Sequence, residues 1–278
     1  MRIQILGTAA AEACPAIFCD CENCQEIRRK GDPRDVRRRA SYLIDDDTLV
    51  DFGPDAFSQA TAFQIDLTKI QRILFTHAHL DHQNATDLMW RHKGYSRCSK
   101  PIRLLGSHYT LGILFSRLSA EGESISFAEL LADPVELAYY QEITDGDLAI
   151  LPLEADHAPG KAPMLYLISR NGKTLLVGND TGFFLPKVWE HLEGKHIDAA
   201  LLDCTSSLRY ANQERGHMGA NTVVRVAERL REMSCVDDAS RLVATHFSHN
   251  GGSIHSDLEA FFAPHRIEVA YDGLTLKV

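Results

Sequence analysis

The sequence contains no apolar run of about eighteen residues, so it predicts no membrane-spanning helix. Its N-terminus, MRIQILGTAAAEACPA, has an apolar stretch only at 3–6, which is too short for the hydrophobic region of a signal peptide. No internal repeat or low-complexity segment stands out. With 278 residues, 45% of them hydrophobic, we expect one α/β domain spanning 1–278 in a cytoplasmic protein.

Positive charge is scarce, because the chain has 29 Lys and Arg residues against 38 Asp and Glu residues and a formal net charge of -9. This balance argues against an extended nucleic-acid surface, which needs clustered cations to neutralise phosphates. The one basic run, RRKGDPRDVRRRAS at 28–41, is the exception. We interpret it as a solvated helix and loop in preference to a nucleic-acid patch.

The chain has seven cysteines, an odd number, and no predicted secretory signal, which argues against a disulfide scaffold. Four are scattered and are expected to be ordinary thiols: Cys14, Cys98, Cys204 and Cys235. Cys19, Cys21 and Cys24 instead cluster in FCDCENC, within a loop at 14–30. Three close thiolates can grip a soft metal such as zinc, which prefers a fourth ligand, although three incidental loop cysteines are the alternative.

Short apolar strands are predicted along the whole chain, at 2–6, 41–46, 48–53, 72–76, 102–106, 148–154, 164–169, 173–180, 198–204, 241–247, 267–273 and 274–278. Apolar residues at three- and four-residue spacing predict helices over 108–120 and 221–233. A shorter helix is expected at 126–132, inside an insertion near 118–140. Two packed sheets flanked by helices accommodate this order.

The segment ILFTHAHLDHQNATDLMW places three imidazoles and a carboxylate directly after a strand: His77, His79, Asp81 and His82. Four ligands so close together crowd a single ion but can serve two adjacent ions, and imidazole with carboxylate suits Zn, Fe or Mn. Later strands end at His157, Asp180 and His246, which can complete both coordination shells. A carboxylate with two oxygens makes Asp180 the natural bridge, whereas capping or hydrogen bonding is the alternative role for each lone residue.

These motifs resemble the metallo-β-lactamase-fold hydrolases, for which THAHLDH is a signature, and the resemblance spans nearly the whole chain. It implies an αββα sandwich with two mixed sheets and two metal ions at one edge. The implied ligands are His77, His79 and His157 for one ion, Asp81, His82 and His246 for the other, and Asp180 between them. An Asp bridge is similar to the phosphodiesterase, glyoxalase and lactonase branches, and less so to the β-lactam-hydrolysing branch.

A closer resemblance is to the PhnP-type cyclic-phosphate phosphodiesterases that accompany carbon–phosphorus lyase. They carry a similar cysteine claw after the first strand and complete it with a His three residues beyond the last catalytic His. The motif THFSH puts His249 in that place, which implies a structural zinc held by three cysteines and His249. The loop AAAEACPA departs from the family, because it lacks the glycines expected before the claw.

His217, just before the second predicted helix, resembles a His near the scissile group of related phosphodiesterases. Its expected role is general acid or phosphate contact, and capping or surface solvation is the alternative. Asp51 ends a strand and is expected to orient a ligand His. Three cations, Lys161, Arg209 and Arg215, could neutralise phosphate, although surface solvation is the simpler role for each.

The sequence therefore predicts a metal-dependent phosphodiesterase that acts on a small cyclic phosphate or a nucleotide. Two ions would lower the pKa of a shared water, the resulting hydroxide would attack, and Asp81 could take up the proton. The alternatives are a tRNA 3′-processing nuclease, a lactonase or thioesterase, and a non-catalytic protein of this fold in pyrroloquinoline quinone biosynthesis. The family resemblance adds a homodimer as an expectation.

Overall fold

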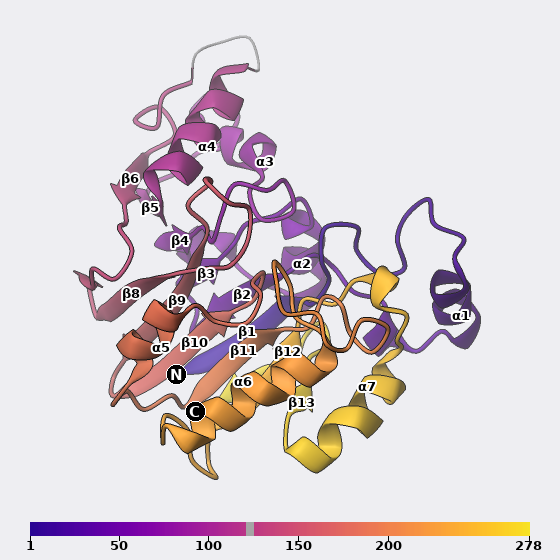
Figure 1. Cartoon of the computed structure of the whole chain (residues 1–278). Helices are drawn as coiled ribbons and strands as arrows, with labels where there is room; N and C mark the ends of the chain where they lie inside the picture. The colour runs from indigo at the N-terminus through magenta and orange to yellow at the C-terminus, as the bar shows by residue number, and fades with distance from the viewer. Residues whose placement is uncertain (121–124) are drawn as a thin grey trace.

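The computed structural model describes residues 1–120 and 125–278 and consists of two stacked seven-stranded sheets (Figure 1). Helices cover the outer face of each sheet, which confirms the predicted αββα sandwich with two mixed sheets. The two chain ends lie side by side, and the amino group of Met1 donates to the carbonyl of Val278 at 3.0 Å. An apolar core between the sheets contains Tyr42 and Tyr166, both fully buried.

The first sheet has the strand order β14-β1-β2-β3-β4-β5-β6. Its strands are β14 (Thr275–Lys277), β1 (Arg2–Gly7), β2 (Ser41–Ile44), β3 (Thr48–Val50), β4 (Arg72–Leu74), β5 (Ile102–Gly106) and β6 (Ala132–Glu136). The strands from β3 to β6 run parallel, whereas β14, β1, β2 and β3 pair antiparallel in turn. The parallel strands therefore end at one edge of this sheet.

The second sheet has the order β13-β12-β11-β10-β9-β8-β7. Its strands are β13 (Glu268–Val269), β12 (Arg241–Thr245), β11 (Ala199–Asp203), β10 (Lys173–Gly178), β9 (Met164–Arg170), β8 (Leu148–Glu154) and β7 (Ile143–Asp145). The strands β10 to β13 run parallel, and β7 to β10 pair antiparallel. Central strands such as LAILPLE and AALLD are almost wholly apolar because both faces of the sheet are covered.

The helices are α1 (Glu22–Lys30), α2 (Ala56–Phe63), α3 (Ala85–Met89), α4 (His108–Ala120), α5 (Pro186–Leu192), α6 (Ala220–Glu232) and α7 (His255–Phe262). Apolar residues of α2, α3 and α4 join the core on the outside of the first sheet, and those of α5, α6 and α7 join the core outside the second. In α6, the apolar positions Val223, Val226 and Leu230 are fully buried, which is the spacing of one helix face. Helix α1 stands apart from both layers (Figure 1).

The helices predicted at 108–120 and 221–233 correspond to α4 and α6. The short helix predicted at 126–132 is wrong: this segment is a turn in which Ala132 N donates to Phe127 O at 2.8 Å. Leu131 has a positive φ of 49°, which ends the turn, and the chain then enters the edge strand β6. Strands β6 and β7 were not predicted. Part of the insertion expected near 118–140, residues 121–124, lies outside the described residues.

Across the described ranges, no helix is long and apolar enough to cross a membrane.

Candidate metal centre

The segment from His77 to His82 leaves β4 and turns tightly before α3. The carbonyl of His79 accepts hydrogen bonds from the backbone N–H groups of His82 and Gln83, both at 3.1 Å. A Cβ atom on Gly53 would lie 2.0 Å from the carbonyl oxygen of Asp81, so only glycine allows the turn to pack this closely. The local fold thus turns all four polar side chains toward the same edge of the two sheets.

Three further site residues follow strand ends in a left-handed backbone conformation. Asp51 follows β3 with φ 62°, Asp180 follows β10 with φ 57°, and His246 follows β12 with φ 60°. Non-glycine residues seldom adopt this conformation, and where they do, the surroundings hold them there, often at functional sites. In each case the bend directs the side chain into the space between the sheets' edges.

The first group of ligand atoms comprises His77, His79 and His157. The Nε2 atom of His77 lies 2.9 Å from Nδ1 of His79, and Nε2 of His157 lies 3.2 Å from the same atom. Three imidazole nitrogens, all within 4.8 Å of one another, converge on one point. Three His ligands with open further positions are typical of a catalytic zinc site.

The second group lies beside the first and comprises Asp81, His82, Asp180 and His246, all of them buried. The Nε2 atom of His82 is 2.8 Å from Asp180 Oδ2 and 2.9 Å from Asp81 Oδ2, and Nε2 of His246 is 3.3 Å from Asp180 Oδ2. Asp180 also reaches the first group, since its oxygens lie 3.5 Å from His77 and 3.4 Å from His157. Its carboxylate therefore stands between the two groups, as a bridging ligand must.

The opposite nitrogens of four imidazoles are held by neighbouring oxygens, which leaves each Nε2 facing the centre. These Nδ1 contacts are Thr76 Oγ1 with His77 at 3.0 Å, Asp51 Oδ2 with His82 at 2.7 Å, Gly216 O with His157 at 3.2 Å and Thr205 Oγ1 with His246 at 2.8 Å. Such outer contacts set the tautomer and orientation of metal-binding imidazoles. Asp51 thus occupies the position predicted for it, buried and bonded to His82.

The charge of the centre fits divalent cations. Four buried carboxylates gather here, those of Asp51, Asp81, Asp180 and Asp203, and within residues 1–120 and 125–278 none of them pairs with Lys or Arg. Unpaired buried carboxylates are costly, so the site demands positive charge from imidazolium or from metal.

The pKa values of two imidazoles are shifted by these carboxylates. Burial lowers the pKa of His82, yet the carboxylates of Asp81 and Asp51 outweigh it and raise the pKa well above its ordinary value. Burial likewise opposes ionisation of His246, but Asp180 raises its pKa to about 10. The Nε2 atoms of both rings are buried, and neither has a well-oriented hydrogen-bond partner in the part of the chain that is described. A divalent cation would displace the proton from each of these nitrogens and use the lone pair as a ligand.

Asp203, the last residue of β11, was missed by the sequence interpretation. Its fully buried carboxylate accepts hydrogen bonds from the backbone N–H groups of Met218 at 2.8 Å, Asp180 at 3.0 Å and Thr205 at 3.0 Å. Its Oδ2 atom also lies 3.3 Å from Nδ1 of His217. Burial opposes ionisation of Asp203, but the hydrogen bonds of the neighbouring imidazoles hold its pKa below the ordinary value. The only signal in the sequence is one more strand that ends at Asp.

His217 lies at the edge of the centre, where its ring is 4.9 Å from that of His157 and 5.9 Å from that of His246. Burial lowers its pKa, whereas the hydrogen bond to Asp203 raises it, and the net shift is upward. The side chain retains 32% exposure, so its free edge faces solvent. His217 therefore combines a fixed orientation with access to an incoming molecule.

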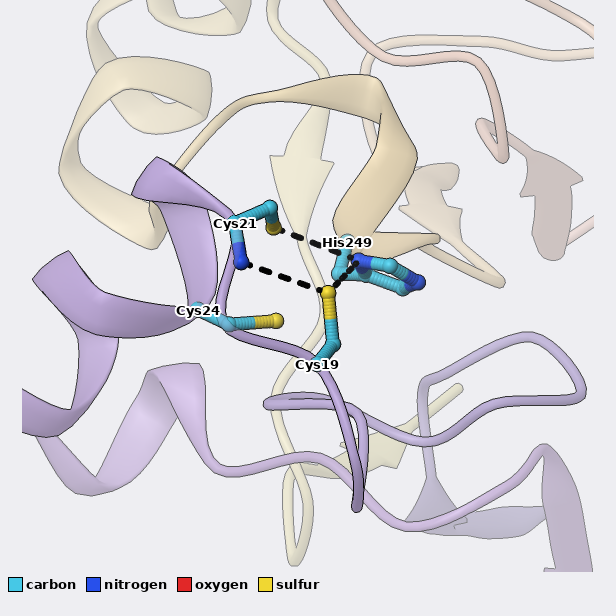
Figure 2. Close-up of side chains that lie close together, drawn as sticks. All are labelled: Cys19, Cys21, Cys24 and His249. Carbon is cyan, nitrogen blue, oxygen red and sulfur yellow. Dashed lines mark hydrogen bonds between the residues drawn. The ribbon is translucent and has the colours of Figure 1, made fainter.

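The cysteine claw forms a second, separate cluster (Figure 2). The sulfur atoms of Cys19 and Cys21 both lie 3.6 Å from Nδ1 of His249, and Cys24 points at the same space from helix α1. All four ligand atoms lie within 4.8 Å of one another. Burial raises the pKa of Cys21, but the hydrogen bond with His249 and others outweigh it and lower the pKa to about 6. A thiolate of this kind is a good zinc ligand.

The claw loop is fastened to the rest of the fold by the basic run. Arg28 donates to the carbonyls of Cys19 at 2.7 Å and Ala16 at 2.9 Å. Arg37 is only 4% exposed, lies over the ring of Phe247 and donates a hydrogen bond to Nδ1 of His255 at 3.0 Å. The interpretation of 28–41 as a solvated run is therefore wrong for Arg37. Its guanidinium is buried because carbonyl and hydroxyl oxygens satisfy it.

The three cations considered for phosphate binding differ in their surroundings. Arg215 is 81% exposed and pairs with Asp156, with Nε 2.9 Å from Oδ2. Arg209 approaches the carbonyl of Asn250 at 3.4 Å, and Lys161 lies exposed in the loop after His157. Of these, Arg215 is the one placed between the segments that carry His157 and His217.

Comparisons with known proteins show which proteins this chain resembles in sequence and in fold. A family model described as a beta-lactamase superfamily domain matches residues 47–247. The chain is 23% identical to "Coenzyme PQQ synthesis protein B" of Azoarcus sp. (strain BH72), covering 100% of both. The structure of Zn(2+)-bound PqqB from Methylobacterium extorquens superposes with a TM-score of 0.76 at 19% identity, covering 100% of both chains. A diphosphatase from the PhnP family gives 0.73 at 24% identity, covering 99% of this chain and 97% of the other. At these identities the two structures show a shared fold.

Proposed function

The chain belongs to the β-lactamase superfamily, and from that premise we propose that it is a metal-dependent phosphodiesterase acting on a small cyclic phosphate or a nucleotide. The observation that carries the proposal is the pair of adjacent ligand groups joined by Asp180, with His217 held at their edge by Asp203. Two ions about 4 Å apart are typical of enzymes that cleave phosphate esters.

In this proposal His77, His79 and His157 would hold one divalent ion, and Asp81, His82 and His246 would hold the other. Asp180 lies between the two groups and would serve both, and Zn, Mn or Fe suit these ligands. When bound, such ions lower the pKa of water and stabilise negative charge on phosphoryl oxygens. Asp81 lies 2.9 Å from Nε2 of His82 and is the carboxylate proposed to receive the proton released from water.

His217 contributes by its orientation. Asp203 fixes Nδ1 as the protonated nitrogen, so that Nε2 is the atom presented toward an arriving substrate. An imidazole whose pKa is raised can donate a hydrogen bond to a phosphoryl oxygen or a proton to the leaving oxygen. The first of these roles concerns phosphate, and it is the reason for proposing phosphodiester cleavage in preference to a lactonase or thioesterase reaction.

The cysteine claw is proposed to hold a structural zinc through Cys19, Cys21, Cys24 and His249. His249 begins the short 3-10 helix His249–Gly251, and the same strand end carries His246. A zinc here would anchor the segment that presents His246. The claw therefore supports the active centre without taking part in the reaction.

A second candidate function is a role in the biosynthesis of a quinone cofactor, because the full-length relatives are named coenzyme PQQ synthesis protein B. These relatives are 23% and 25% identical to the chain, over 100% and 99% of its length. A binding or non-hydrolytic role at the same centre would need the metal ligands but no general acid. His217 and its fixation by Asp203 favour the hydrolytic candidate.

The separating experiment measures hydrolysis of bis(p-nitrophenyl) phosphate, a lactone panel and a thioester panel by the metal-loaded protein. The proposal expects turnover of the phosphodiester above the other two classes, and loss of that turnover in His217→Ala with retained metal content. Turnover of a lactone or thioester in preference to the phosphodiester would refute the assignment. No hydrolysis of any class would favour the biosynthetic role.

A further inference from the structure

Two of the claw cysteines stand at the start of helix α1 in a C-x-x-C arrangement. Cys21 is the residue that precedes the first turn of α1, with an extended backbone of φ -60° and ψ 158°, and Cys24 is the third residue of the helix. Side chains three residues apart are neighbours on the surface of a helix. Proteins that form and break disulfides in their reactions use a C-x-x-C pair. The claw therefore has the arrangement of a redox pair as well as that of a zinc site.

The two sulfurs of this pair differ in their access to solvent. Cys21 is half-buried, whereas Cys24 is fully buried. Phe18, in the loop that leads into the claw, is fully exposed, so the claw lies at the surface of the molecule. Cysteines that respond to oxidants are solvent-accessible and often stand next to a second cysteine that completes the disulfide. Cys21 meets the first condition, and Cys24 supplies the second.

Distances favour a bond between Cys21 and Cys24. All three sulfurs of the claw lie within 4.8 Å of one another, and those of Cys21 and Cys24 face the same space from the start of α1 (Figure 2). A disulfide of about 2 Å then needs mainly side-chain rotation. Cys19 is held differently, because its sulfur accepts from the backbone N–H of Cys21 at 3.5 Å and its carbonyl accepts from Arg28 at 2.7 Å. Cys14 is buried and lies outside the group of four ligand atoms.

The start of α1 is also attached to the fold by contacts that need no metal. Asn23, between the two cysteines, is buried, and its Nδ2 donates to the carbonyl of His249 at 3.1 Å. Arg28 donates to two carbonyls of the loop, at 2.7 and 2.9 Å. These hydrogen bonds do not involve a sulfur of the C-x-x-C pair. A change in the bonding of Cys21 and Cys24 therefore leaves the helix and the loop attached, which allows the change to be reversed.

We propose that Cys21 and Cys24 form an oxidation site, at which hydrogen peroxide makes a disulfide and thereby releases the zinc of the claw. The Cys21 thiolate attacks one peroxide oxygen, the O–O bond breaks, and a sulfenic acid forms as hydroxide leaves. The Cys24 thiolate attacks this sulfur, the S–S bond forms, the S–O bond breaks, and a second hydroxide leaves. The two sulfurs lose two electrons to the peroxide, and two protons from solvent convert the hydroxides to water.

Release of the zinc follows from the number of ligands that remain. After oxidation only Cys19 and His249 are left, whereas structural zinc requires four ligands. The segment that carries His249, and with it His246, then loses an anchor. A dithiol such as dithiothreitol attacks the disulfide and restores both thiolates. The inference rests on the zinc proposed for the claw and is independent of the reaction proposed for the dinuclear centre.

The test begins with the zinc content of the purified protein, which is then treated with a small molar excess of hydrogen peroxide. A coloured chelator records zinc release, and mass spectrometry after alkylation of free thiols maps the disulfide. We expect about one zinc per chain to be released, a bond between Cys21 and Cys24, and recovery of zinc binding after dithiothreitol. Cys24→Ser should oxidise at Cys21 to the sulfinic acid, which dithiothreitol does not reverse. Cys98→Ser, which removes a half-buried cysteine outside the claw, should behave as wild type.

Claw zinc that stays bound in peroxide would overturn the proposal, as would a mapped bond to Cys19 or reversible zinc release from Cys24→Ser. The mapping in the wild-type protein needs no variant, so a folding defect cannot obscure it. Purified protein without claw zinc would refute the zinc assignment, and the mapped disulfide would then decide whether Cys21 and Cys24 pair.

Discussion

Replacing Asp203 with Asn tests how the centre is held together, because the side chain keeps its size and loses its charge. The carboxylate of Asp203 accepts hydrogen bonds from the backbone N–H groups of Asp180, Thr205 and Met218 and from the hydroxyl of Thr205, and it faces the ring of His217. In Asp203→Asn, the amide oxygen can still accept hydrogen bonds at the position of one of the two carboxylate oxygens. The amide nitrogen must then face at least one backbone N–H group, that of Asp180 at the position of Oδ2 or those of Thr205 and Met218 at the position of Oδ1.

The magnitude follows from these contacts. A buried donor left without an acceptor costs about 1–3 kcal/mol, and at least one pair of donors faces each other in the variant, so we expect a loss of about 2–4 kcal/mol in the free energy of unfolding. His217 also loses the acceptor that fixes its tautomer. Removing such an outer contact typically costs about 10–100-fold in activity or metal affinity. We therefore expect kcat to fall about 100-fold.

The assay is the rate of bis(p-nitrophenyl) phosphate hydrolysis, with metal content and urea unfolding measured on the same preparations. Asp198→Asn is the matched control, because Asp198 lies just before the other end of β11 and pairs with Lys173 at 2.7 Å. It should lose some stability and keep its activity. If Asp203→Asn stayed within twofold of wild type in both rate and stability, the role assigned to Asp203 would be wrong.

The remaining predictions concern the two metal clusters and one buried His. His249→Ala should release zinc at lower chelator concentration and lower the melting temperature, whereas His246→Ala should lose turnover with little change in melting temperature. Wild-type zinc content in His249→Ala would show that His249 is no ligand. Asp180→Asn should abolish turnover and lower the content of active-centre metal without lowering the melting temperature of the metal-free protein; measurable turnover would contradict a bridging role. Burial and Arg37 lower the pKa of His255 to about 4. The folded protein therefore favours neutral His255, and this contribution to the free energy of unfolding is present above pH 6.5 and is lost as the pH falls toward 4. The expected loss is about 2 kcal/mol after allowance for partial solvation, and His255→Gln should lack this part of the pH dependence in urea unfolding at pH 7 and 4.5; an unchanged dependence would exclude His255 as its source.

Much of the fold could be predicted because apolar periodicity is a local property. The helix at 108–120 and strands such as 148–154 appear where the pattern placed them. Strand β6, in contrast, reads ADPVE and has a mostly exposed pattern, so nothing apolar identifies it. It exists because it pairs with β5 at the sheet edge. Tertiary pairing of this kind overrides local propensity.

The candidate site was likewise only partly predictable from the sequence. The spacing of His77, His79, Asp81 and His82 is itself a chemical signal, and the structure brings these residues together with the three predicted strand-end residues. Asp203 carried no such signal, since several strands end at Asp and only the stacking of the sheets distinguishes them. A cavity of about 470 Å³ beside His157 is lined partly by the loop at 155–163, and no sequence spacing predicts the shape of that loop.

The burial of Arg37 is a further example. A cation within a basic run is ordinarily predicted to be a surface residue, because charged residues are rarely buried without partners. Here the partners lie far along the chain, at Thr8, Ala270 and His255. Long-range satisfaction of this kind becomes visible only once the sandwich has closed.

The most direct test of the central claim is metal reconstitution followed by activity. Protein stripped of active-centre metal by mild chelation is titrated with Zn²⁺ or Mn²⁺ while hydrolysis of bis(p-nitrophenyl) phosphate is recorded. Two ligand groups joined by Asp180 predict that activity rises with added metal and reaches its plateau at about two equivalents per chain, with about one further zinc retained throughout. A plateau at one equivalent, or no hydrolysis at any ratio, would contradict a dinuclear phosphodiesterase.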